Sequence, residues 1–132
     1  MEQSHITIKE QGEKRMKYNE LIENLPVWNK FLNLEVAAIY VQPIMDTHKT
    51  IMDELNFITQ EKKSILEKYN GRIENGVAVI DNKEDVEKYN ADVDFLMNGD
   101  MNIKPISIKS IDIGSKLSPA LAITLQDIVR IV

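Results

Sequence analysis

Cysteine is absent from the 132-residue chain, which excludes disulfides and metal sites built on thiolates. This absence fits a protein that works in a reducing cytosol. Apolar runs are short as well. None reaches the roughly 18 residues that a membrane-spanning helix needs, so we expect no membrane contact. The polar start MEQSHITIKEQGEKR is also unsuited to be the apolar core of a secretory signal.

The motifs of common enzyme classes are missing too, since there is no glycine-rich phosphate loop, no G-x-S-x-G and no HExxH. Neither His5 nor His48 has a second histidine at ligand spacing. We interpret His48 as a core residue with a satisfied side chain; a pH-sensitive packing role is the alternative. Asp81, Asp85 and Glu87 lack the glycine and the final glutamate of a calcium loop. We therefore expect no enzymatic activity, no metal site and no cofactor.

Negative charge is concentrated in one segment of the chain. Residues 81–100 hold seven acids and two lysines, and seven minus two equals the magnitude of the net charge of −5. Because no basic patch balances it, we expect no direct nucleic-acid binding. The segment is either a solvated helix face or a surface for a basic protein partner. The candidate partner-binding face consists of Glu84, Asp85, Glu87, Asp92 and Asp94.

The longest periodic segment predicts one long helix over about residues 33–69. Apolar residues recur in it every seven positions, which gives a helix a continuous seam that a partner helix must cover. We expect this cover to come from the N- and C-terminal helices, or from a second copy of the chain in a homo-oligomer. Pro43 predicts a kink. The two rows are Ala37, Ile44, Ile51, Ile58 and Ile65, and Leu34, Val41, His48 and Leu55.

Turn and cap signals outline the other elements. Pro26 predicts a break after a helix that begins near residue 17. Asn70-Gly71 predicts the end of the long helix, and Asn75-Gly76 predicts a hairpin over 72–80. In that hairpin we expect Ile73, Val77 and Val79 to share one face.

The last third of the chain adds a helix, a strand and another helix. Asp81, three residues before Glu84, predicts a capping box for a helix over about 82–97. Alternating isoleucines predict a strand over 103–113, and Ser118 before Pro119 predicts a helix that continues to the C-terminus. The fold class is therefore α+β. It is mostly helical, with a long helix that Pro43 can kink, a small antiparallel sheet (hairpin 72–80 plus strand 103–113) and a C-terminal helix.

The N-terminal residues differ from the rest. Residues 1–15 are polar and lack helical periodicity, whereas a helix-forming stretch follows Met16. We expect 1–15 to be an arm that lies upstream of a true start at Met16; a short genuine extension is the alternative. Residues 16–132 are predicted to form a single globular domain.

Several of these segments together resemble a known family. They are the helix end EKKSILEKYNG at 61–71, the hairpin ending in Asp81, the acidic helix ending at Leu96–Asn98, the isoleucine-rich strand, and the stretch LSPALAITL at 117–125. This series resembles small proteins encoded by phages and prophages of Gram-positive bacteria, grouped as a domain of unknown function.

The resemblance implies a context for the chain. It implies a phage protein that acts in the host bacterial cytoplasm or is built into the virion, with a phage or host protein as its partner. Two functions stay open. One is a small assembly or structural accessory. The other is an inhibitor of a host defence system such as CRISPR, which would present the acidic face to a nucleic-acid-binding site.

Overall fold

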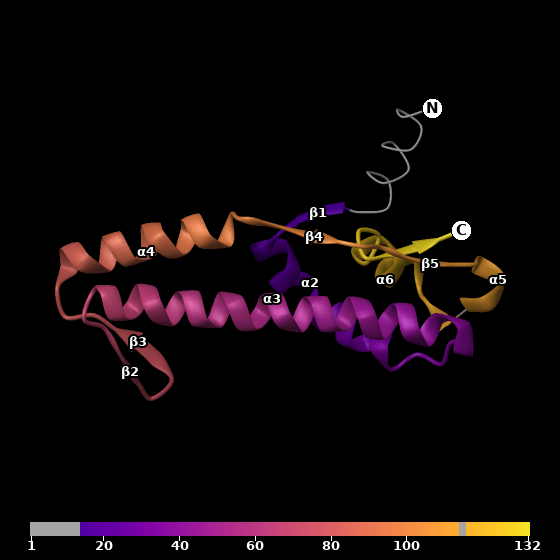
Figure 1. Ribbon diagram of the computed structural model, residues 1–132, viewed down its shortest axis with the longest axis horizontal. Coiled ribbons are helices and arrows are strands. Elements are labelled where there is room, and N and C mark those ends of the chain that lie inside the picture. The colour runs from indigo at the N-terminus through magenta and orange to yellow at the C-terminus, as the bar shows by residue number, and fades with distance from the viewer. Residues whose placement is uncertain (1–13, 114–115) are drawn as a thin grey trace, which may run out of the picture. The chain divides into compact units, whose positions relative to one another are not determined.

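The computed structural model describes residues 14–113 and 116–132 (Figure 1). Helices dominate and the described strands form two-stranded sheets, so the α+β class is confirmed. Contacts group the chain into two compact units. Among the described residues, unit 1 comprises 14–51, 100–113 and 116–132, and unit 2 comprises 52–99. Each unit is described separately, and a single folding domain over 16–132 stays a prediction.

Unit 1 begins with a strand and a helix. Strand β1 (Lys14–Lys17) pairs antiparallel with β4 (Asp100–Ile103), which sets buried Met16 opposite buried Met101. Lys14 and Arg15, assigned to the N-terminal arm from the sequence, thus belong to a sheet. Residues 1–13 lie outside the described residues, and a start at Met16 stays a prediction.

Helix α2 (Tyr18–Leu32) follows β1 and runs through Pro26. The predicted break at this residue is wrong. Leu21 precedes the proline and Trp28 follows it, and both side chains are buried. Burial on both sides of Pro26 keeps the chain helical, because packing outweighs the loss of one backbone hydrogen bond.

The long helix starts later than its sequence pattern indicates. The chain leaves α2 at Asn33, passes through the 3₁₀ turn η1 (Ala38–Tyr40) and enters α3 (Val41–Lys68). The expected start near residue 33 is therefore wrong. The predicted kink at Pro43 is wrong as well, because Pro43 is the third residue of α3. In a first turn the backbone N–H has no intrahelical acceptor, so proline removes nothing.

The end of α3 agrees with the prediction. Asn70 has a φ of 55°, and the Gly71 N–H donates to the Leu66 carbonyl at 2.9 Å. A Cβ added to Gly71 would overlap the Leu66 side chain, so a larger residue here would require that side chain to shift. The signal Asn70-Gly71 therefore ends the helix as expected.

The apolar rows of α3 differ in burial. Ile51 and Ile58 of the first row are buried, whereas Val41 of the second row is exposed. His48 is half-buried, and its Nδ1 accepts a hydrogen bond from Trp28 Nε1 at 3.1 Å. The interpretation of His48 as a satisfied residue is confirmed, and this contact joins α2 to the start of α3 within unit 1.

The C-terminal part of unit 1 departs most from the sequence pattern. The strand predicted over 103–113 is divided by Lys104-Pro105, and β5 (Ile106–Ile108) is followed by the short helix α5 (Ser110–Ile113). Proline lacks the N–H that a continuous ladder would need at this point. Strand β5 pairs in parallel with β6 (Val129–Ile131), so the strand and the hairpin do not share a sheet.

Helix α6 (Pro119–Thr124) starts as predicted, since the Ser118 Oγ accepts from the Leu121 N–H. It packs against α2. It ends at Thr124, so the prediction that this helix continues to the C-terminus is wrong for residues 125–132. The residues beyond it pair with β5 instead, and Ile128 and Val129 are buried there. Gly114, which reads as a turn glycine, lies outside the described residues.

Unit 2 contains the C-terminal part of α3, a hairpin and α4 (Lys83–Met97). The hairpin joins β2 (Arg72–Glu74) and β3 (Val77–Val79) through Asn75 and Gly76, both with positive φ, as predicted. Ile73 pairs with Ala78, and Val77 pairs with Glu74. Cross-strand partners share a face, so the expectation that Ile73 lies with Val77 and Val79 is wrong. Figure 1 shows α4 running back in the direction opposite to α3.

Candidate functional site

Helix α4 carries the acidic face predicted from the sequence, and its ends are fixed by local hydrogen bonds. The Asn82 Oδ1 accepts from the Glu84 N–H at 2.9 Å, so Asn82 is the N-cap and the capping box built on Asp81 is wrong. At the other end, Asn98 Nδ2 donates to the Asp94 carbonyl at 2.8 Å. The last turn holds no basic residue, so α4 itself supplies no positive charge at the negative end of its dipole.

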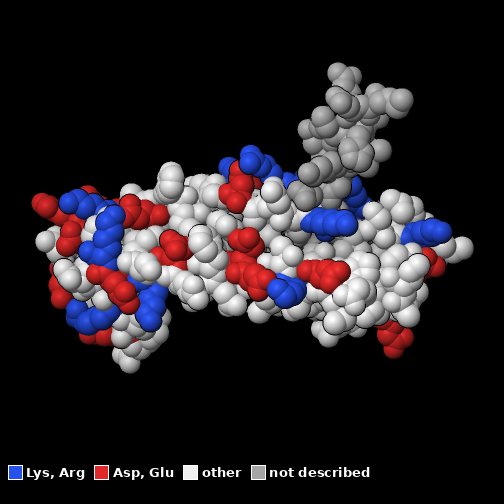
Figure 2. Space-filling model, in the orientation of Figure 1, with Lys and Arg blue, Asp and Glu red and all other residues white. Residues whose placement is uncertain are grey.

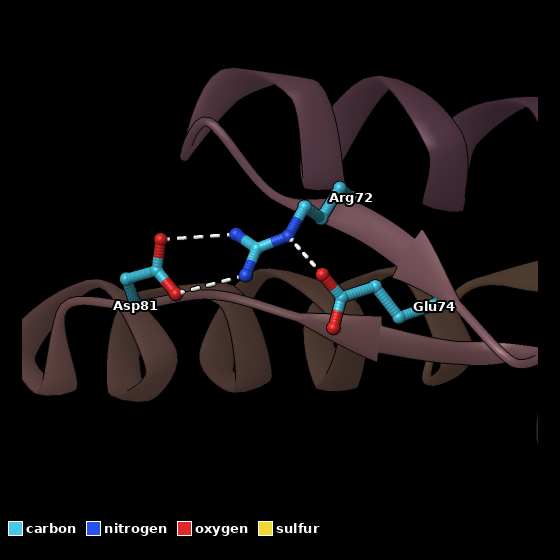
Figure 3. A network of polar contacts seen from close by, with 3 residues as sticks. All are labelled: Arg72, Glu74 and Asp81. Atoms are coloured by element: carbon cyan, nitrogen blue, oxygen red, sulfur yellow. Dashed lines mark hydrogen bonds and ion pairs between the residues drawn. The ribbon is translucent and has the colours of Figure 1, made fainter.

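Asp81 is engaged elsewhere, in a clasp that closes the hairpin (Figure 3). The Arg72 guanidinium donates to both Asp81 oxygens, at 2.9 and 3.2 Å, and its Nε donates to Glu74 at 2.5 Å. Hydrogen bonding to Arg72 lowers the pKa of Asp81, and the same contacts raise the pKa of Arg72. Because the clasp holds the carboxylate of Asp81, the next residue caps α4.

The two sides of α4 differ in exposure. One side is half-buried, although no residue of this fully described helix is completely buried. The other side, which we call the outward face, is exposed along its length. It consists of Lys83, Glu84, Glu87, Lys88, Asn90, Ala91, Asp94 and Phe95.

The five predicted partner-binding acids divide between these sides. Glu84, Glu87 and Asp94 lie on the outward face, whereas Asp85 and Asp92 are half-buried. Asp92 accepts from the Tyr69 hydroxyl at 2.6 Å and from Lys68 Nζ at 3.2 Å. These hydrogen bonds, that of Tyr69 first, lower the pKa of Asp92, and the carboxylate raises the pKa of Tyr69 in turn. Asp92 therefore ties α4 to the end of α3 within unit 2.

The residue that sequence reasoning missed is Phe95. Its side chain is 85% exposed. A signal was available, because Glu84, Lys88, Ala91 and Phe95 follow one another in steps of four, three and four residues. Such steps keep residues on one helix face. Phenylalanine therefore shares a stripe with charged residues and an alanine.

Charge over unit 2 is mixed in sign on the face that Figure 2 shows. Acidic and basic side chains alternate there around the hairpin and the start of α4. The ion pairs that bring them together include Arg72–Asp81, Arg72–Glu74 and Lys68–Asp92. The net negative charge of residues 81–100 thus does not form a uniform patch, and the outward face carries three acids, two lysines and one exposed aromatic side chain.

An apolar hollow of unit 1 offers little chemistry. This groove of about 390 Å³ at the start of α3 is lined only by apolar residues, so it has no polar side chain to orient a small ligand. Within residues 14–113 and 116–132, no three histidine or acidic side chains are grouped as a metal ion requires. In the same residues, no helix combines the length and apolarity that crossing a membrane would demand. The groove is lined by Phe31, Leu32, Leu34, Val36, Val41, Ile44 and Met45.

Comparisons with protein-family models, with curated proteins and with solved structures found no match to this chain.

Proposed function

We propose that this chain is a non-enzymatic phage protein that acts through protein–protein contact, as a small assembly or structural accessory. The observation that carries the protein-binding part is the exposure of Phe95 on the same helix face as Glu84, Glu87 and Asp94. Exposed aromatic side chains rimmed by polar groups are typical of binding surfaces. The phage context comes from the resemblance of the sequence and is part of the proposal, as is a location in the host cytoplasm or the virion.

Unit 2 as a whole supports this proposal. Its completely buried apolar side chains are Ile58 and Leu66, whereas Ile73 and Val77 of the hairpin are each 62% exposed. A two-stranded hairpin gains little stability on its own, and exposed apolar side chains gain burial when a partner covers them. Unit 2 therefore combines a small core with large exposed apolar side chains that a protein partner would cover.

The alternative function is inhibition of a host defence protein. The outward face favours it through its three acids, because a nucleic-acid-binding site is basic and would attract them. Pairing of two copies through α3 is a further possibility that stays a prediction. Val41 and Met45 remain exposed on α3 and could contribute to such a pairing.

Site-specific photo-cross-linking in infected cells tests the proposed function. A photoreactive residue replaces Phe95, and the matched control carries it at Ile111 of α5, whose side chain is 87% exposed. We expect position 95 to give a discrete protein adduct that position 111 does not give. A phage structural protein in that adduct supports the accessory function, and a host nucleic-acid-binding protein supports the inhibitor. Equal labelling from both positions would contradict the proposal.

A further inference from the structure

We infer that the outward face of α4 receives a basic protein segment that places an arginine side chain on the ring of Phe95. This inference rests on the proposed function, and it names the chemistry of the partner at that same face. Three features of α4 carry it: the accessibility of the ring, the charges beside it, and a last helical turn without a basic residue.

The ring of Phe95 is open to a partner. Phe95 is 85% exposed, so its ring is little covered by the rest of the chain. The residue one turn earlier on the same stripe is Ala91, also exposed, and its single methyl group leaves room beside the ring. A planar guanidinium can therefore stack on the ring without displacing any side chain of the outward face.

The charges around the ring favour a cation. Asp94 is adjacent to Phe95 in the chain, and Glu87 lies two turns earlier next to the same stripe. Lys83 and Lys88 are the cations of the outward face, in a helix that is described throughout. The exposed acids Glu84, Glu87 and Asp94 therefore exceed the cations of the face by one.

The end of α4 adds to this attraction. The C-terminal turn carries the negative end of the helix dipole, and it contains no basic residue. Helices commonly place lysine or arginine at this point, so the missing charge is one that a partner can supply. Together with the ring quadrupole, which attracts cations to its face, these groups select an arginine over an acidic or uncharged anchor. A nucleic acid, which is anionic, would be repelled.

A peptide titration tests the inference on the full chain. The probe is a helical peptide of alanine and arginine, and its twin carries citrulline, which has the shape of arginine without the charge. We expect the arginine peptide to shift amide signals of residues 87–98 in an NMR titration, with at least about 10-fold tighter binding than the twin. F95L, which keeps an apolar side chain but removes the ring, should weaken binding about 3- to 10-fold, and I111L should not change it.

Three results would overturn the inference: equal affinity for the twin, equal affinity of F95L and the unmodified chain, or shifts spread over acids outside α4. Binding of a single-stranded oligonucleotide at residues 87–98 would also overturn it. Failure here is distinct from failure of the proposed function. If position 95 cross-links to a discrete partner whose adduct peptide contains no arginine or lysine, the inference is wrong while the proposed function stands.

Discussion

Replacing Trp28 with alanine is expected to lower the free energy of unfolding of unit 1 by about 3–5 kcal/mol. Trp28 is 1% exposed and stacks on Phe31, with 5.4 Å between ring centroids. Its Nε1 also donates to His48 Nδ1, which joins α2 to α3. The substitution therefore removes a large buried side chain and leaves the imidazole nitrogen without its donor. No other single truncation in the described chain removes a larger buried side chain.

Urea denaturation followed by circular dichroism measures this effect, because the substitution removes the only tryptophan of the chain and with it the tryptophan fluorescence. F95A is the matched control, since it truncates an aromatic side chain that is exposed. We expect it to change the free energy of unfolding by less than about 0.5 kcal/mol. A change of less than about 1 kcal/mol in W28A would show that Trp28 does not hold α2 on α3.

Reversing the three acids of the outward face should weaken binding of the cross-linked partner on the order of 100-fold. The triple variant E84K/E87K/D94K converts attraction to a basic surface into repulsion, and like charges across an interface cost several kcal/mol in total. Because the three side chains are exposed, high salt should reduce the difference between the variant and the unmodified chain. Isothermal titration calorimetry at low and high salt measures both effects.

The design leaves Asp92 unchanged, because reversing it would break the contacts with Tyr69 and Lys68 and disturb unit 2. The control variant E23K/E35K/E67K reverses three exposed acids outside α4, so it changes the net charge by the same amount. We expect the control to bind nearly as the unmodified chain does. Equal losses in both variants would assign the effect to net charge rather than to the outward face.

Local signals in the sequence predicted the structure correctly where it depends on residues that are neighbours in the chain. Asn75-Gly76 adopts the two positive φ angles of the predicted turn, and Ser118-Pro119 starts α6 as expected. Asn70, which follows the end of α3, likewise has the positive φ angle that the sequence predicted. Each of these features depends on backbone conformations that few residue types adopt, and the residue names therefore reveal them.

Features that depend on residues distant in the chain could not be predicted from these local signals. The apolar periodicity after Pro119 fits a helix, yet residues 129–131 pair with β5, which lies some twenty residues earlier in the chain. Periodicity likewise continued through residues 34–40, where the chain leaves α2 and turns into α3. In both cases tertiary pairing or packing overrides a local preference, and a single sequence does not show it.

The site was predictable in part. Composition and spacing indicated an acidic helix, and three of its five proposed acids lie on the outward face. Sequence alone gave no sign that Asp92 would be held by Tyr69, because that contact spans the hairpin. Phe95 was missed although helical spacing places it on one stripe with Glu84, Lys88 and Ala91, because an exposed phenylalanine contradicts the usual expectation that this residue packs inside.

The affinity of F95A for the cross-linked partner tests the central claim most directly. We expect F95A to bind at least about 30-fold more weakly than the unmodified chain, as truncation of a central aromatic anchor does. I111A, which truncates an apolar side chain of similar exposure in unit 1, should bind within about 2-fold of the unmodified chain. Unchanged affinity of F95A would contradict the account, because the outward face of α4 would then not be where the partner binds.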